Sequence, residues 1–385
     1  LAELNVTTWR DALTKVMERV PRDKKFVLVL DEFQWMAQTS PELPSVLQEL
    51  WDMDWSRRGN VMLMLCGSFI GFMEREVLGK ESPLFGRKTG QIFLRPFGFR
   101  EAGLFHKELS LVDRAKIYYV CGGIPYYLKL ISAGKSLAAN LQTHLLDPGG
   151  ALSNEPDFLL REELREVEKF YALLMVIATG AGVASEIERL TGVPARSQNY
   201  YLSKMEALGY VSRRYPLTRG RPNPRQVRYV LEDPLLRFWF RFLYLRGSEL
   251  LRRSPAENYR SLLKPELESY FGSCFERLCR EALPDLYLAE GEEPIGEVGE
   301  YWSKETQIDV VCLREDEAID LGECKWGRSR SLPRLEAELR EKMRFYPNPR
   351  NGTVRGLLFT RSAAPKSYAP SPDVKGYCLE DLYGG

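Results

Sequence analysis

Four ionisable side chains in the last third of the chain have the types and spacing of a divalent-cation site. Asp309 lies in an apolar segment, and Glu323 follows fourteen positions later at the end of another. Lys325 is two residues further and shares a face with Glu323 if this segment is a strand. Two carboxylates can bind Mg²⁺, an ammonium group can position a water that attacks a phosphodiester, and Glu276 upstream can complete the metal shell. The alternative is a solvated Lys–Glu pair at a strand end, which contributes little.

A second pair of carboxylates follows an apolar run near the start of the chain. Residues 26–30 are apolar, and Asp31 and Glu32 come directly after them. Ligands of α/β sheets bind at this end of a strand, so we expect Asp31 to hold the Mg²⁺ of ATP and Glu32 to orient or deprotonate the attacking water. Ser68 ends the next predicted strand, where it can reach a γ-phosphate, and Arg87 can neutralise transition-state charge. The alternatives are a solvated acidic turn and a solvated loop cation.

A third feature is a local concentration of arginine. Residues 209–230 carry six arginines and no acidic residue, although the net charge of the whole chain is only +1. Such a patch on a hairpin beside a recognition helix is typical of DNA phosphate contacts. The alternative is a spacer between domains, in which the arginines pair with the acidic stretch 290–300. The predicted DNA-binding residues are Gln198, Asn199, Lys204, Arg213, Arg214, Arg219, Arg221 and Arg225.

The apolar periodicity predicts an α/β chain. Short, fully apolar runs alternating with helical patterns favour a buried parallel sheet at the start of the chain. The predicted strands there are residues 26–30, 61–66 and 91–94, and the predicted helices are residues 9–19 and 44–51. A helical stretch, residues 100–146, leads to a linker at 147–156 that is rich in Pro and Gly.

The remaining chain predicts two further domains. Helices at 162–178, 185–190 and 197–208, followed by strands at 210–214 and 226–231, have the order of a winged helix-turn-helix. A smaller α/β domain follows, with helices at 267–283 and 332–344 and strands at 308–313, 318–324 and 356–360. The predicted boundaries are 1–98, 99–157, 158–250 and 251–385.

These motifs together resemble the archaeal and bacterial STAND-class AAA+ ATPases. The resemblance is carried by Asp31 to Trp35, Cys66 to Ser68, the segments 84–89 and 94–97, and Gly123-Ile124-Pro125-Tyr126-Tyr127. It implies a partial P-loop ATPase sheet, a helical lid with Pro125 near the nucleotide base, a winged helix, and a restriction-endonuclease-like C-terminal domain. Trp302, Asp309, Glu323 and Lys325 match the PD-(D/E)XK pattern of that domain.

One expected motif is missing. The phosphate-binding loop G-x-x-x-x-G-K-[ST] should precede the strand that bears Asp31, and the sequence does not contain it. Gly134-Lys135-Ser136 imitates only its end and follows the acidic strand, so we interpret it as a helix terminus. Because the chain begins with Leu1 instead of methionine, we expect the loop upstream of Leu1. Without it, ATP binding should be weak.

The composition of the chain limits the classes of protein to which it can belong. With 44% hydrophobic residues and a net charge of +1, the chain is an ordinary globular protein. No apolar run is long enough to span a bilayer, so no membrane partner is expected. Seven cysteines without a C-x-x-C pair predict reduced thiols in the cytoplasm. If Arg87 acts on a neighbouring subunit's nucleotide, the protein must form a homo-oligomer.

The sequence therefore predicts an ATPase, using ATP and Mg²⁺, that is coupled to DNA binding and metal-dependent DNA cleavage. The alternative is a DNA-binding nucleotide switch that does not cleave and whose nuclease-like domain is a binding platform.

Overall fold

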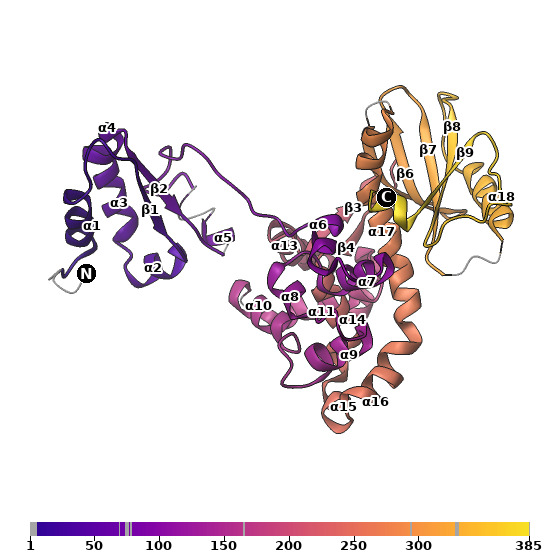
Figure 1. Cartoon of the computed structure of the whole chain (residues 1–385), viewed down its shortest axis with the longest axis horizontal. Helices are drawn as coiled ribbons and strands as arrows, with labels where there is room; N and C mark the ends of the chain where they lie inside the picture. The colour runs from indigo at the N-terminus through magenta and orange to yellow at the C-terminus, as the bar shows by residue number, and fades with distance from the viewer. Residues whose placement is uncertain are drawn as a thin grey trace. The chain divides into compact units, whose positions relative to one another are not determined.

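The structure is a computed structural model that describes residues 6–68, 70–73, 77, 79–164, 166–292, 295–327 and 331–384 (Figure 1). The chain divides into two units, residues 1–94 and residues 95–385. Both contain helices and strands, which confirms the predicted mixed α/β class. Within the described residues, no helix is both long and apolar enough to cross a membrane.

The first unit is built around two parallel strands. Its elements are α1 (Trp9–Glu18), β1 (Phe26–Leu30), α2 (Phe33–Thr39), α3 (Leu43–Leu50), a π-helical turn (Trp51–Trp55), α4 (Ser56–Arg58), β2 (Val61–Leu65) and α5 (Ile70–Phe72). Strands β1 and β2 pair in register from Phe26 with Val61 to Leu30 with Leu65. One face packs on a core that includes Phe33, Leu43 and Trp55.

Two sequence predictions for this unit are wrong. Residues 91–94 form no strand, and the side chains of Ile92 and Leu94 are exposed. The predicted sheet is also not covered on both faces, because Val27 and Met62 are more than half exposed. Exposed positions alternate with half-buried positions along both strands, and Leu30 at the end of β1 is buried, as in a sheet covered on one side. Apolar composition alone did not reveal how many layers cover the strands.

The second unit begins with a helical region. Its helices are α6 (Phe99–Gly103), α7 (Leu111–Cys121), α8 (Pro125–Leu130), α9 (Leu137–Leu141), α10 (Glu155–Glu163), α11 (Val167–Ala178), α12 (Ala184–Thr191) and α13 (Ala195–Ala207). The hairpin of β3 (Val211–Arg214) and β4 (Arg228–Leu231) follows, and then α14 (Pro234–Phe242), α15 (Gly247–Arg252) and α16 (Pro255–Asn258). Helices α11, α12 and α13 pack in sequence, and the hairpin contacts α11 and α13.

Part of the predicted linker at 147–156 is integrated into this core. Leu152 is fully buried, and the indole of Trp239 donates a hydrogen bond of 2.9 Å to the Ser153 carbonyl. Only glycine fits at position 150, because an added Cβ would lie 2.6 Å from the His144 carbonyl oxygen. One apolar cluster runs from Phe99 to Leu382 through these elements. The predicted boundaries at 157 and 250 therefore lie within one unit.

A five-stranded sheet closes the chain. Its elements are α17 (Lys264–Glu290), β5 (Ile295–Trp302), β6 (Gln307–Arg314), β7 (Ile319–Lys325), α18 (Leu332–Met343), β8 (Val354–Thr360), β9 (Val374–Cys378) and α19 (Leu379–Leu382). The strand order is β5-β6-β7-β8-β9; β5, β6 and β7 are antiparallel, whereas β8 and β9 run parallel to β7. Helix α17 contacts β5, β6 and β7, and α18 contacts β6, β7 and β8 (Figure 1). Strand β5 was not predicted.

Candidate functional site

The acidic end of β1 meets the end of β2 in the first unit. Glu32 follows β1 in a left-handed conformation with a φ of 51°, which is uncommon for a residue with a side chain. The amide nitrogen of Gln34 donates to both the Glu32 carboxylate and the Ser68 hydroxyl, and Ser68 donates to the same carboxylate across 3.2 Å. Asp31 and Glu32 remain exposed. The strand ends thus bring Glu32 and Ser68 together, with Gln34 as a bridge that the sequence did not predict.

Arg87 is held by groups of its own unit. Its guanidinium makes two hydrogen bonds to the Asp52 carboxylate, of 2.9 and 2.7 Å, and also donates to the carbonyls of Pro83 and Phe85. This contact keeps the pKa of Asp52 below its ordinary value. In this structure Arg87 is therefore engaged by Asp52, and a role at a phosphate requires that it exchange this partner.

Pro125 is the first residue of α8 in the second unit, where its fixed φ suits the start of a helix. The preceding Gly123 packs against Phe97, whose N–H donates to the Gly123 carbonyl across 3.0 Å. An added Cβ at Gly123 would lie 1.8 Å from the Phe97 carbonyl oxygen, so only glycine fits. Two of the motifs that carry the family resemblance are thus in direct contact.

Asp309, Glu323 and Lys325 lie on one part of the five-stranded sheet. Val310 pairs with Gly322 in the antiparallel ladder, so Asp309 on β6 falls opposite Glu323 on β7, and residues opposite one another share a face. An Asp309 carboxylate oxygen accepts a hydrogen bond of 3.0 Å from the Cys324 backbone. Lys325, at the end of β7, is exposed. The sequence-based expectation of a shared face is consistent with this register.

Electrostatics link Glu276 on α17 to these strands. Burial first, and then the nearby Asp309 carboxylate, raise the pKa of Glu276 to about 8. The same two causes raise the pKa of Glu323 to about 7, and burial also raises the pKa of Asp309. Burial therefore makes all three carboxyl groups resist ionisation, and the Asp309 charge adds to this effect at Glu276 and Glu323. Such perturbed groups are over-represented at functional sites.

The carboxylates are not arranged as they would be in a complete metal-binding site. Among the residues that the structure describes, no group of three His, Cys, Asp or Glu side chains is placed to hold a metal ion. The donor chemistry suits Mg²⁺, which prefers carboxylate oxygens. However, one Glu323 oxygen accepts a hydrogen bond of 2.6 Å from the Nζ of Lys342 on α18. A cation bound by Asp309 and Glu323 would have to replace this contact.

The arginines of the hairpin have different surroundings. Arg214 bridges Glu232 at 2.8 Å and Glu300 on β5 at 3.3 Å. Arg219 donates to the backbone carbonyls of Arg314, at the end of β6, and of Ala318, in the loop that follows it. The contact of Arg214 with Glu300 agrees with the alternative in which the hairpin arginines pair with the acidic stretch 290–300, whereas the partners of Arg219 lie outside that stretch. Both guanidinium groups are engaged.

The other predicted DNA contacts divide into buried and exposed groups. Gln198 is 1% exposed, and its amide donates to the carbonyls of Ala184 and Val193, so it holds the turn before α13. The prediction that Gln198 contacts DNA is not supported by this position, because its side chain is inside the fold. The exposed side chains are Asn199, Arg213, Arg221 and Arg225, while Lys204 is half-buried over the Phe170 ring.

Two parts of the chain match families of known sequences. Residues 2–131 match a family described as an ATPase domain predominantly from Archaea, and residues 239–338 match one described as archaeal and bacterial proteins of unknown function. The chain is also 25% identical over 328 residues to the uncharacterized protein MJECL04 of Methanocaldococcus jannaschii, which covers 84% of this chain and 73% of that protein. These matches support an archaeal ATPase-type family. The ATPase domain indicates ATPase activity and nucleotide use, typically with Mg²⁺.

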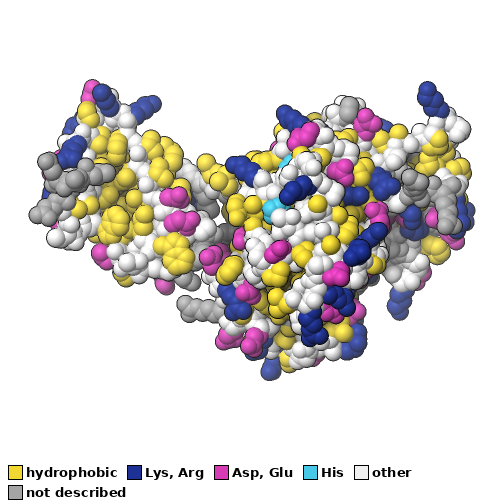
Figure 2. Space-filling model, turned by 60° about the horizontal axis from the view of Figure 1, so that its bottom comes forward, with side chains coloured by type: hydrophobic (Ala, Val, Ile, Leu, Met, Phe, Trp, Pro, Cys, Tyr) yellow, Lys and Arg dark blue, Asp and Glu magenta, His cyan; other side chains and the backbone are white. Residues whose placement is uncertain are grey.

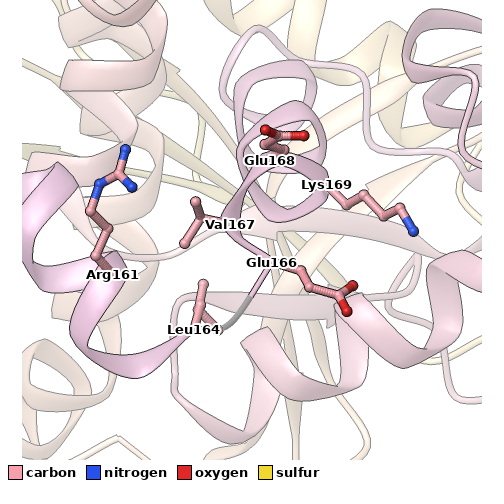
Figure 3. Close-up of a pocket in the computed structure, with 6 residues that line it drawn as sticks. All are labelled: Arg161, Leu164, Glu166, Val167, Glu168 and Lys169. Atoms are coloured by element: carbon pink, nitrogen blue, oxygen red, sulfur yellow. The ribbon is translucent and has the colours of Figure 1, made fainter.

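Two hollows in the described part of the surface lie apart from the strand ends. A depression of about 590 Å³ between α10 and α11 is lined by Arg161, Glu166, Glu168 and Lys169, which point in different directions (Figure 3). A cleft of similar size lies between the hairpin, α17 and β5, with Arg277, Arg280 and Glu300 in its wall. Both hollows mix positive and negative groups, so neither has the one-signed lining of an anion site.

Charged and apolar groups are also distributed unevenly at the surface. Figure 2 shows many hydrophobic side chains at the surface of the first unit, and Lys and Arg side chains scattered over both units. The exposed sheet positions Val27, Val29, Met62 and Met64 belong to the apolar surface of the first unit.

Proposed function

We propose that this protein is an ATPase whose C-terminal sheet cleaves DNA phosphodiester bonds with a divalent cation. The ATPase is proposed to be of the STAND AAA+ type, with a lid at residues 99–157. Asp31 would hold the Mg²⁺ of ATP and Glu32 would orient the attacking water. Ser68 and Arg87 would contact the phosphates, and Pro125 would lie near the base.

The observation that carries the cleavage proposal is the convergence of three carboxylates. Glu276, Asp309 and Glu323 come from α17, β6 and β7, and in addition to burial the charge of Asp309 helps to raise the pKa of both Glu276 and Glu323. The elements of this sheet follow one another as a helix, three antiparallel strands, a helix and a parallel strand. This order supports the PD-(D/E)XK resemblance. A core without function would gain stability from apolar residues at these positions, so the acidic cluster needs another explanation.

The proposed chemistry assigns a task to each side chain. Asp309 and Glu323 would bind the divalent cation with Glu276 near them, and a bound cation supplies a Lewis acid and an activated water. Lys325 would position the attacking water or the phosphate with its ammonium group. Because it is exposed at the end of β7, it can meet a substrate that approaches from solvent.

DNA binding is proposed for the winged helix-turn-helix formed by α11 to α13 and the hairpin. The contacts would come from the exposed Arg221 and Arg225 of the loop between β3 and β4, and from Asn199 on α13. Arg213 has a partner in Glu206 at 2.9 Å but remains 38% exposed, so it can also face a phosphate. Cations on a hairpin loop contact phosphates without reading sequence.

A plasmid-nicking assay with Mg²⁺ or Mn²⁺ tests cleavage. Wild-type protein should nick supercoiled DNA, and both Glu323→Gln and Lys325→Ala should lower the rate by roughly a hundredfold or more. The matched control is Glu290→Gln, because Glu290 at the end of α17 makes a similar pair, at 2.6 Å, with Lys375 on β9 of the same sheet. Equal nicking by wild type and Glu323→Gln would show that the activity is not made at this site.

The second candidate function is a DNA-binding ATPase switch that does not cleave. It is favoured by two observations: no three-ligand metal group is found among the described residues, and Lys342 contacts Glu323. This function predicts DNA binding that depends on nucleotide and no cleavage with any divalent metal. A gel-shift titration with and without ATP, run beside the nicking assay, separates the two functions.

A further inference from the structure

The side chain that reaches the carboxylates is Lys342, not the lysine of the sequence motif. Lys342 Nζ lies 2.6 Å from a Glu323 carboxylate oxygen, and this is an ion pair. Lys325 is exposed and has no comparable contact among the described residues. The candidate site therefore contains a second ammonium group, delivered by α18.

Helix geometry explains why Lys342 arrives there. Leu335 and Leu339 are buried against the sheet, and Lys342 lies three positions after Leu339, which places it on the same face of α18. It occupies the last turn of the helix, where a positive charge is favoured by the helix dipole. A lysine on a core-facing stripe requires a partner, and Glu323 provides it, with 31% of the Lys342 side chain and 13% of the Glu323 side chain exposed.

The ion pair also engages Glu323, which is one of the proposed metal ligands. A carboxylate oxygen that accepts a hydrogen bond from an ammonium group binds a metal cation more weakly. The ammonium group and the cation would lie next to the same oxygen, and their positive charges repel each other. The Lys342 ammonium group therefore occupies the position at Glu323 that a divalent cation bound by this carboxylate would take.

We propose that Lys342 is the resident counter-ion of this carboxylate cluster and competes with a divalent cation for Glu323. This inference rests on the proposed metal-dependent function of the same site. It makes α18 part of the site, since metal binding must swing Lys342 away from Glu323. The freed ammonium group would then lie beside the bound cation, on the side of the sheet that α18 covers.

The test is Mn²⁺ binding to the full chain without nucleotide, measured by loss of the free-ion EPR signal. Lys342→Met should tighten binding about tenfold or more, because the competing charge is gone and a tenfold change corresponds to about 1.4 kcal/mol. Lys342→Arg keeps the charge and should not tighten it. Lys375→Met is the matched control, because it breaks a Lys–Glu pair of equal length elsewhere on the sheet. Glu323→Gln should weaken binding.

The outcomes separate this inference from the proposed function. Binding that depends on Glu323 but is unchanged or weaker in Lys342→Met overturns the competition and leaves the metal site standing. Tightening in both Lys342→Met and Lys375→Met also overturns it, since the effect would then be general. No Mn²⁺ binding to wild type or to Lys342→Met overturns the metal site and the competition together. If Lys342→Met does not give the wild-type circular dichroism spectrum, Lys342→Gln replaces it with the same expected result.

Discussion

Replacing Glu276 by glutamine should stabilise the protein at alkaline pH and leave it nearly unchanged at acidic pH. Burial and Asp309 move the pKa of this carboxyl from 4.5 to about 8. A raised carboxyl pKa contributes stability that is complete below the pKa of the unfolded chain and is lost as pH rises through the folded value. The loss therefore falls between about pH 4.5 and pH 8. Glutamine keeps the shape but cannot ionise, so this loss disappears.

The size of the effect follows from the displacement of the pKa. Each tenfold change in an ionisation constant is about 1.4 kcal/mol, so the whole displacement corresponds to roughly 4–5 kcal/mol. Asp309 shares the interaction, and removing Glu276 alone relieves only part of it. We expect Glu276→Gln to exceed wild type by about 2–4 kcal/mol at pH 9 and to match it within about 1 kcal/mol at pH 5.

Differential scanning calorimetry of the full chain in EDTA measures this difference without bound metal. The unfolding temperature of Glu276→Gln should lie several degrees above wild type at pH 9 and coincide with it at pH 5. Glu297→Gln is the control, because Glu297 is exposed on β5 of the same sheet. The reasoning is refuted if Glu276→Gln is less stable than wild type at pH 9, or if the difference is the same at both pH values.

Three further predictions concern other parts of the chain. Glu32→Gln should lower the rate of steady-state ATP hydrolysis by about a hundredfold or more while nucleotide binding persists. An unchanged rate would mean that Glu32 is not the catalytic base. Arg219→Ala should destabilise by about 1–2 kcal/mol in denaturant because its partners are backbone carbonyls, whereas Arg221→Ala should leave stability intact and lower the salt slope of DNA binding by about one. The reverse pattern would exchange their roles. Gly123→Ala should destabilise by about 2 kcal/mol or more by clash, whereas Gly272→Ala, in open space within α17, should be neutral or stabilising.

The strands that carry the acidic residues were predictable because their signals are local. Residues 26–30 form β1 with the predicted bounds, and β2, β6 and β7 deviate by one residue at one or both ends. Apolar runs that end in carboxylates require only neighbouring residues to be recognised. The alternation that places Glu323 and Lys325 on one face is likewise a property of a single strand.

Predictions were less successful for strands whose formation depends on a neighbouring strand. The segment 91–94 has the composition of a strand, but no partner strand accepts it among the described residues. Strand β5 was read as an acidic stretch, because Glu297 and Glu300 mask its alternation; it is a strand because β6 pairs with it. Strand formation at an edge is decided by the neighbour, which a single sequence segment does not contain.

The sequence by itself determined which chemistry is available: acidic strand ends, an arginine-rich hairpin and an E-x-K triplet, each specified by residues that are close along the chain. Only the tertiary structure decided which of these groups are already engaged. Lys342 reaches Glu323 across 19 positions and Arg214 reaches Glu300 across 86. Contacts of this kind depend on how helices and sheets pack, and packing is a property of the whole core and not of any one motif.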